Sequence, residues 1–236
     1  MALLCYTVGI EKVLEKVIAI DGPAGVGKST VAREVAKRLG YSFLDTGSIY
    51  RAATQYCQLS DVPFEDEVSI YCAVLQFVHE TNDGMGYQSA FSADDTTVEI
   101  NGFDITKDIR TEELSQKVHY ISSNLKARAL IIKLQQDLVK QLNEVGVVLE
   151  GRDTTDVIAP SAKVKILLTA SNEVRAKRRA QELSEDYQTI FDDLNTRDNK
   201  DSEVTNFADT TRTDVVVIDT TNLTIDQVVQ AIVANC

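Results

Sequence analysis

The feature that most constrains this chain is a glycine-rich turn at residues 22–27, which lies between an apolar run and a helical pattern. Gly22, Gly27, Lys28 and Ser29 satisfy the pattern G-x-x-x-x-G-K-[ST]. Glycines let successive backbone N–H groups turn inward toward phosphate oxygens, and the N-terminus of the following helix favours a negative charge. The sequence therefore predicts a P-loop that binds a nucleoside triphosphate, rather than a strand–helix turn with an incidental lysine.

The residues of this loop have distinct expected roles. Lys28 can reach the β- and γ-phosphates and is a candidate catalytic residue, while the Ser29 hydroxyl can ligate Mg²⁺. A GTPase would also need an N-K-x-D motif, and the nearest match, DNKDS at 198–202, places Asp201 one residue too early. The residues expected to bind the triphosphate are Gly22, Pro23, Ala24, Gly25, Val26, Gly27, Lys28, Ser29 and Thr30.

Beyond the loop, apolar strand-like runs alternate with helical patterns, which is typical of an α/β fold with a parallel sheet. Several runs are continuously apolar, as strands covered on both faces should be. The expected strands are residues 16–21, 41–45, 146–150, 163–169 and 214–219. The expected helices are residues 28–39, 48–59, 125–143, 171–183 and 224–234, the last with Thr224 as its N-cap.

The segment 61–111 interrupts this alternation. It holds a helix-like stretch at 65–80, followed by GYQSAF and TTVEING with turn residues between them. This pattern predicts a small antiparallel sheet inserted on the main sheet. With three prolines and no long linker, we expect one domain at 16–236, preceded by a loose extension at 1–15.

Composition narrows the function classes. The formal net charge of −12 argues against a surface that coats a nucleic-acid polymer. The four cysteines are scattered and form no C-x-x-C pair, which fits reduced thiols better than a disulfide framework or a zinc site. No apolar run approaches the roughly 20 residues of a membrane span, and the first residues lack the basic region of a signal peptide. We therefore expect a cytoplasmic protein.

Two motifs follow predicted strands. In LDTGSIYRAA (44–53), Thr46 and Ser48 offer small donors and Arg51 offers a guanidinium that can bind a phosphate bidentately. Taken alone, this motif is better explained as a helix N-cap followed by a surface arginine than as a phosphate-binding site. However, VLEGRD (148–153) places Glu150 and Arg152 at another strand end, and the carboxyl ends of parallel strands meet at one edge. The two motifs together predict a second phosphate site, although Arg152 can also pair with Asp153 on the surface.

A third basic group lies in SNEVRAKRRAQEL (171–183). Arg175, Arg178 and Arg179 project from a predicted helix. A solvated charged helix face is the ordinary explanation of this spacing. In a kinase, the same arginines can cover the phosphates, neutralise the transferred group and exclude water.

Taken together, six motifs resemble the bacterial-type cytidylate kinases: IAIDGPAGVGKSTVA, DTGSIYRAA, DIRTEEL, EGRD, RAKRRAQEL and TRDNKDSE. The resemblance runs from about residue 16 to the end of the chain. It implies a P-loop NTPase fold with a five-stranded parallel sheet, a monophosphate-binding insert at about 61–111 and a helical lid at about 175–200. It also implies transfer of phosphate from ATP to CMP or dCMP with Mg²⁺, and we expect a monomer.

The resemblance assigns roles to single residues. Lys28, Arg152, Arg178 and Arg179 would be catalytic, the last two as lid arginines. Ser29 would ligate Mg²⁺, which Glu150 would orient through water. Of the substrate-binding residues, Arg128 and Asp153 would read cytosine, and Arg197 and Asp201 would hold the ribose. The remaining ones, which surround the CMP phosphate, are Thr46, Gly47, Arg51 and Arg152.

The sequence departs from the family pattern in four places. Glu150 stands where the family usually has aspartate, and residues 154–156 read Thr-Thr-Asp in place of hydrophobic-Gly-Thr. His119 falls where a serine is expected, and Val204 where a substrate-binding arginine is typical. The sequence thus favours phosphoryl transfer from ATP more strongly than cytosine specificity. The alternatives are a P-loop kinase for UMP, AMP or a metabolite, and a degenerate kinase that acts as a nucleotide-binding regulator.

Overall fold

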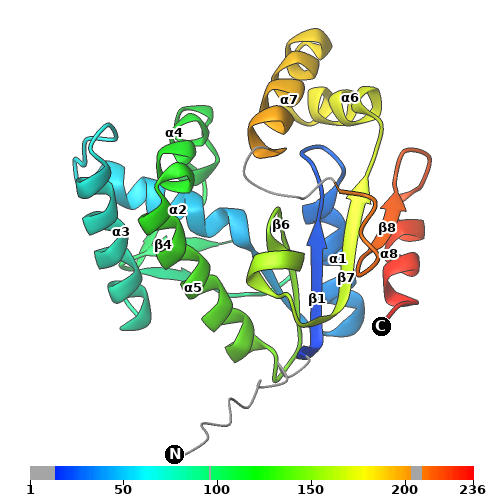
Figure 1. Cartoon of the computed structure of the whole chain (residues 1–236), viewed down its shortest axis with the longest axis horizontal. Coiled ribbons are helices and arrows are strands. Elements are labelled where there is room, and N and C mark those ends of the chain that lie inside the picture. The colour runs from blue at the N-terminus through cyan, green and yellow to red at the C-terminus, as the bar shows by residue number, and fades with distance from the viewer. Residues whose placement is uncertain (1–13, 96, 203–208) are drawn as a thin grey trace, which may run out of the picture.

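A computed structural model describes residues 14–95, 97–202 and 209–236, without the side chains of residues 197 and 199–202. Five parallel strands form the central sheet in the order β2-β6-β1-β7-β8 (Figure 1). The strands are β1 (Leu14–Asp21), β2 (Ser42–Asp45), β6 (Val147–Gly151), β7 (Ala162–Thr169) and β8 (Val216–Asp219). The predicted parallel five-stranded sheet is confirmed.

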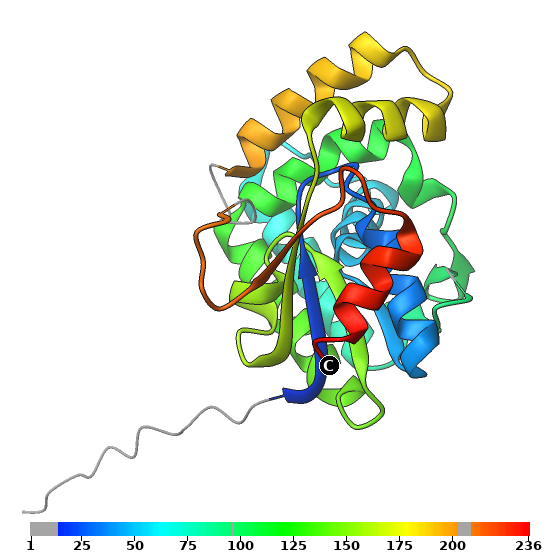
Figure 2. The same ribbon diagram turned by 90° about the vertical axis from the view of Figure 1, so that its right-hand side faces the viewer.

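Both faces of the sheet are buried. Alternate residues of each strand point to opposite sides, and helices cover each side. In β1, Val17 and Ala19 belong to a cluster with residues of α2 (Thr46–Leu59) and α5 (Leu125–Leu142). Ile18 packs instead with α1 (Lys28–Leu39) and α8 (Ile225–Val233), which lie side by side on the other face (Figure 2). Covered faces explain the continuously apolar strands of the sequence.

The insert follows α2. It comprises α3 (Glu67–Asn82), then β3 (Tyr87–Ser89), β4 (Val98–Ile100) and β5 (Phe103–Asp104), which pair in that order as an antiparallel sheet. Asn101 and Gly102 both have positive φ in the turn between β4 and β5, as a tight hairpin turn requires. The predicted antiparallel sheet is therefore confirmed.

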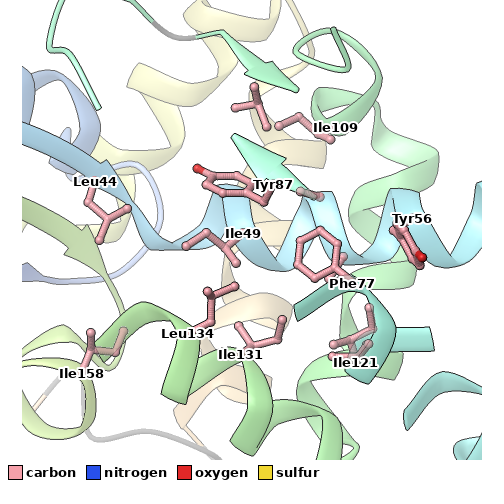
Figure 3. Close-up of a cluster of buried hydrophobic side chains, with 14 of the residues drawn as sticks. Leu44, Ile49, Tyr56, Phe77, Tyr87, Ile109, Ile121, Ile131, Leu134 and Ile158 are labelled. Carbon is pink, nitrogen blue, oxygen red and sulfur yellow. The ribbon is translucent and has the colours of Figure 1, made fainter. Parts of the chain in front are cut away.

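A continuous hydrophobic cluster joins the insert to the central sheet (Figure 3). Phe77 of α3 is fully buried and meets the ring of Tyr56 of α2 edge-on, with ring centroids 5.6 Å apart. Leu44 of β2 and Ile131 of α5 belong to the same cluster. The insert is thus packed against the central sheet and the helices on this face, rather than merely tethered to them.

Two further segments lie beside the carboxyl edge of the sheet. The helices α6 (Asn172–Leu183) and α7 (Tyr187–Ser202) form a hairpin above this edge (Figure 1). Ala176, Ile190 and Leu194 form its small core, and Ala24 of the P-loop packs against them. The π-helical turn η2 (Thr154–Ile158) follows β6.

Several element boundaries differ by one or two residues from the sequence-based expectation. The helix expected at 48–59 begins two residues earlier, at Thr46, because Asp45 caps α2 by accepting a hydrogen bond from Ser48 N at 2.9 Å. The strand β1 begins at Leu14 and β8 at Val216, each two residues away from the expected start. The N-terminal extension predicted for 1–15 otherwise lies outside the described residues.

A whole helix, α4 (Glu112–Ser123), and the short turn η1 (Asp108–Arg110) before it were not predicted. Thr111 caps α4 by accepting from Leu114 N at 3.3 Å, and two glutamates follow in the first turn. This start signal is present in the sequence, but few apolar residues follow it. By contrast, the N-cap expected at Thr224 is confirmed, with Gln227 completing a capping box.

The packing of the insert generates a stability prediction. Phe77→Ala should lower the free energy of unfolding by about 3–5 kcal/mol, because a fully buried aromatic side chain is lost and a cavity remains. Phe103→Ala serves as the matched control, since Phe103 is 75% exposed and its loss should change stability by less than about 1 kcal/mol. Urea unfolding of both variants measures the difference. Equal losses would contradict the packing described here.

Candidate active site

Three chain segments that the sequence singled out meet at the carboxyl edge of the sheet. Glu150 near the end of β6 pairs with Ile20 of β1 on one side and with Asp45 of β2 on the other. The P-loop therefore begins next to Glu150, and the motif at residues 45–51 begins on its opposite side. This register brings together two phosphate-binding motifs that are far apart in the sequence.

The glycines of the P-loop are required by its geometry. Gly25 and Gly27 have φ of 80° and 92°, in the left-handed region that favours glycine. A Cβ on Gly22 would lie 2.3 Å from the carbonyl oxygen of Leu168, and a Cβ on Gly25 would lie 3.0 Å from that of Arg175. The loop is thus confined between β7 and α6. At Gly22 and Gly25 a side chain would therefore clash with these neighbours or strain the backbone.

The first two residues of α1 extend from this loop toward polar groups. Lys28 Nζ donates to the carbonyl oxygen of Pro23 at 2.9 Å, so its side chain curls back along the loop. Ser29 Oγ donates to Glu150 Oε1 at 2.8 Å. These contacts place an ammonium group and a hydroxyl–carboxylate pair at the start of α1, where the helix dipole also favours phosphate.

Glu150 is a buried carboxyl group, 6% exposed. Burial, followed by repulsion from Asp45, raises its pKa, although Lys28, Ser29 and Arg51 act in the opposite direction. Mg²⁺ prefers oxygen donors and usually retains several waters. The Ser29 hydroxyl and the Glu150 carboxyl group are oxygen donors of the kind that Mg²⁺ prefers, and their role in holding this ion stays a prediction.

The motif at residues 45–51 forms the first turns of α2. Arg51 Nη2 donates to Asp45 Oδ2 at 2.8 Å, and the side chain remains 27% exposed. A Cβ on Gly47 would lie 3.1 Å from Arg51 Nη1, so the glycine leaves room for the guanidinium. Ser48 Oγ and Tyr87 Oη lie 2.9 Å apart, which joins α2 to the insert. Arg51 is thus held at the sheet edge by Asp45, which sequence reasoning did not assign to the site.

Thr46 connects this motif to β6. Its hydroxyl donates to the carbonyl oxygen of Glu150 at 2.8 Å, and the residue is 4% exposed. A Cβ on Gly151, the residue after Glu150, would lie 2.2 Å from Thr46 Oγ1. The Thr46 hydroxyl proton therefore fixes α2 against β6, and a role of Thr46 in binding phosphate stays a prediction.

The two residues expected to read a base are in contact. Arg128 Nη2 of α5 donates to Asp153 Oδ2 at 2.5 Å, and the two side chains are 15% and 17% exposed. Burial raises the pKa of Asp153, while the Arg128 guanidinium acts against that shift. Asp153 therefore pairs with Arg128, a contact that the sequence did not predict. Arg152 follows β6 directly and is half-buried.

The arginines of α6 make different contacts. Arg175 is 3% exposed, donates to the carbonyl oxygen of Ala24 at 3.0 Å and pairs with Asp198 of α7 at 2.6 Å. Arg178 donates to the carbonyl oxygen of Thr220 at 2.7 Å, whereas Arg179 pairs with Glu182 on the surface. Arg175 therefore ties the α6–α7 hairpin to the P-loop. The phosphate-covering roles of Arg178 and Arg179 stay predictions.

Some predicted positions fall beyond this description. Arg197 and Asp201 belong to α7, but their side chains lie outside the described residues, as does Val204. His119 is exposed on α4 and its Nδ1 lies 2.6 Å from the carbonyl oxygen of Gln116 in the preceding turn. In the described part of the chain, no helix is long and apolar enough to cross a membrane.

Comparison with known proteins identifies the family. The sequence model of the cytidylate kinases matches residues 18–236. The chain belongs to this family. A cytidylate kinase of Caldicellulosiruptor saccharolyticus is 37% identical over 220 residues, which cover 91% of this chain and 92% of that one. The cytidylate kinase of Lactobacillus johnsonii is 38% identical over 220 residues, covering 91% of each chain. The chain is thus a nucleoside monophosphate kinase.

Solved structures with lower identity share the fold. An uncharacterized protein of Eubacterium ventriosum superposes with a TM-score of 0.51 at 13% identity, covering 93% of this chain and 97% of its own. TT1252 of Thermus thermophilus gives 0.50 at 15% identity over the same shares. These two likenesses support the α/β architecture and nothing finer.

The buried Glu150 generates a second prediction. Since its raised pKa means that the fold favours the protonated form, this carboxyl group stabilises the protein most below the ordinary pKa of 4.5, and that contribution is lost as pH rises. Glu150→Gln should therefore raise the Tm of the nucleotide-free protein at neutral pH, and the gain should shrink toward pH 4.5. Thermal unfolding across this pH range tests it. A variant that is less stable than wild type at neutral pH would refute it.

Proposed function

We propose that this chain transfers the γ-phosphoryl group of ATP to CMP or dCMP and forms ADP and CDP or dCDP. The observation that supports this most directly is the position of Glu150. Its carboxylate accepts from Ser29 of the P-loop, while its carbonyl oxygen accepts from Thr46 of the second motif. One strand end therefore connects the expected donor and acceptor sites.

In the proposed reaction, an oxygen of the acceptor phosphate attacks the γ-phosphorus of ATP. The bond from that phosphorus to the β–γ bridging oxygen breaks, and ADP leaves with the electron pair. The acceptor phosphate is already anionic, so no general base is needed, and catalysis consists of positioning and charge neutralisation. Lys28 would neutralise the phosphates of ATP, and Arg51 and Arg152 would hold the phosphate of the acceptor.

Mg²⁺ would be ligated by Ser29 and reached through water by Glu150, and when bound it supplies further neutralisation of the phosphate charge. For the acceptor, Asp153 would accept a hydrogen bond from the exocyclic amine of cytosine. Arg128 would hold that carboxylate in place through the contact already described. Uracil has a carbonyl oxygen at the position of this amine, so an ionised Asp153 would disfavour UMP.

A panel of acceptors tests this proposal. The purified protein is incubated with Mg-ATP and CMP, dCMP, UMP or AMP, and ADP release is followed. CMP or dCMP should exceed UMP in kcat/KM by at least about tenfold. Preference for UMP or AMP would favour the rival kinase reading, and no turnover with ATP binding intact would favour a nucleotide-binding regulator.

The catalytic role of Lys28 is tested by Lys28→Ala. Loss of one preorganised contact to developing charge should lower kcat by about 10²–10³-fold, without unfolding the protein. Lys133→Ala is the matched control, because Lys133 is exposed on α5 and paired only with Asp137 in the contacts described. Steady-state kinetics with circular dichroism compares the two variants. Near-normal turnover in a folded Lys28→Ala variant would remove the P-loop from this role.

The base-reading role of Asp153 is tested by Asp153→Asn. The amide can donate as well as accept, so the CMP/UMP ratio of kcat/KM should narrow, mainly because UMP improves relative to CMP. The mismatch in the wild type should amount to about 1–3 kcal/mol. Asp137→Asn on the exposed side of α5 is the matched control. An unchanged ratio with both activities reduced together would leave Asp153 a partner of Arg128 only.

A further inference from the structure

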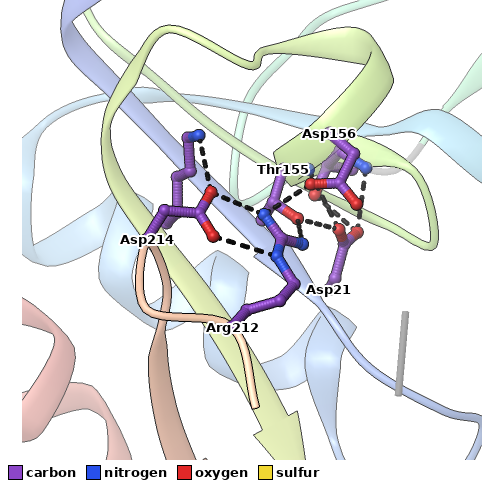
Figure 4. A network of polar contacts seen from close by, with 7 residues as sticks. Asp21, Thr155, Asp156, Arg212 and Asp214 are labelled. Atoms are coloured by element: carbon purple, nitrogen blue, oxygen red, sulfur yellow. Dashed lines mark hydrogen bonds and ion pairs between the residues drawn. The ribbon is translucent and has the colours of Figure 1, made fainter. Parts of the chain in front are cut away.

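Arg212 lies at the centre of a polar network between three segments of the chain (Figure 4). Its Nη1 donates to Thr155 Oγ1 at 2.9 Å, and its Nε and Nη2 donate to the two carboxylate oxygens of Asp214 at 3.0 and 2.7 Å. Nη2 also pairs with Asp156 Oδ1. The Arg212 side chain is 14% exposed, whereas those of its partners Asp156 and Asp214 are 35% and 51% exposed.

The network continues to the end of β1. Asp21 is 2% exposed and accepts four hydrogen bonds, from the backbone N–H groups and the hydroxyls of Thr154 and Thr155, at 2.6–2.9 Å. The Thr155 hydroxyl has one proton and gives it to Asp21, so it receives the Arg212 N–H on a lone pair. The chain from guanidinium to hydroxyl to buried carboxylate therefore has one polarity throughout, which strengthens each bond.

Two of the three segments adjoin the candidate active site. Asp21 directly precedes Gly22 of the P-loop, and Thr154–Asp156 directly follow the acceptor residues Arg152 and Asp153. Residues 154–156 are also where this chain departs from the family pattern. Each of the three side chains that depart is bound by Asp21 or by Arg212.

We propose that Arg212 is a positioning residue for the phosphate acceptor. By binding Thr155 and Asp156, it holds the backbone that carries Arg152 and Asp153 in the orientation that meets the acceptor. This rests on the proposed function, because it assigns acceptor binding to those two residues. The P-loop depends on Arg212 much less, since Asp21 keeps three hydrogen bonds that do not involve the Thr155 hydroxyl.

The test separates the two substrates. Arg212→Ala should raise the KM of the acceptor about ten- to hundredfold, because small displacements of binding groups cost that much. The KM of ATP should stay within about twofold of wild type, as expected for an independent site. Arg212→Lys keeps the charge but cannot bridge Asp156 and Asp214 in the same way. Its KM for the acceptor should therefore lie between those of Arg212→Ala and wild type. Arg38→Ala, which breaks the exposed pair with Asp226, should change neither KM.

A double-mutant cycle identifies the contact responsible. Asp156→Ala should also raise the acceptor KM, and combining it with Arg212→Ala should add little, because both changes remove the same contact. A lower Tm with both KM values unchanged, equal increases in both, or fully additive effects would each overturn the proposal. If Arg212→Ala does not fold, Arg212→Lys and Asp156→Ala carry the same test.

Hydrogen–deuterium exchange of residues 152–158 makes this inference distinguishable from the proposed function. Loss of Arg212 should accelerate exchange in this segment and leave residues 22–30 protected as in wild type. If the wild type phosphorylates no monophosphate, the proposed function fails, and the exchange pattern still decides whether Arg212 fixes the segment. Unchanged exchange at 152–158 in Arg212→Ala overturns the positioning role.

Discussion

The burial of the Glu150 carboxyl group is the constraint on which the rest of the site depends. The carboxyl group lies at the end of a strand paired with both β1 and β2, and it contacts Ser29 directly. Burying a charge is costly unless it is compensated, and both burial and Asp45 disfavour the ionised form. Lys28, Ser29 and Arg51 oppose that cost. Lys28 and Arg51 thus favour the ionised form of Glu150, in a place where phosphates would also need positive charge.

Two arginines of the proposed acceptor site are held by carboxylates. Arg51 pairs with Asp45, and Arg128 pairs with Asp153. Each pair limits the rotamers of a long side chain before any ligand binds, which reduces the ordering cost of binding. A phosphate that binds Arg51 has to compete with Asp45. The ion pair therefore orients Arg51 but also weakens the contact between Arg51 and the phosphate. These positions therefore favour a ligand that offers several contacts at once over a single anion.

The fold and the donor half of the site could be read from the sequence because their signals are local. Alternation of apolar runs predicts the sheet, and the glycine spacing predicts the P-loop together with the strand and helix beside it. The start of α2 was missed because Asp45 both ends β2 and caps α2. The sequence does not show the second role, in which Asp45 accepts a hydrogen bond from Ser48 N. The pair Arg128–Asp153 and the network of Arg212 join residues 25 and 57 positions apart, and no local pattern encodes such contacts.

The difference between the contacts that the sequence predicts and those that it does not has a physical origin. Phosphate is recognised mainly by backbone N–H groups and a helix terminus, whose positions follow from short-range geometry. A base is recognised by side chains that several elements must bring together and hold, and those contacts depend on packing across the whole domain. The departures of this chain at residues 154–156 fall in that second category, and the structure places Arg212 and Asp21 around them. The positions that differ at 154–156 are therefore held by residues far away in the sequence, whereas the P-loop allows little variation at Gly22 and Gly25.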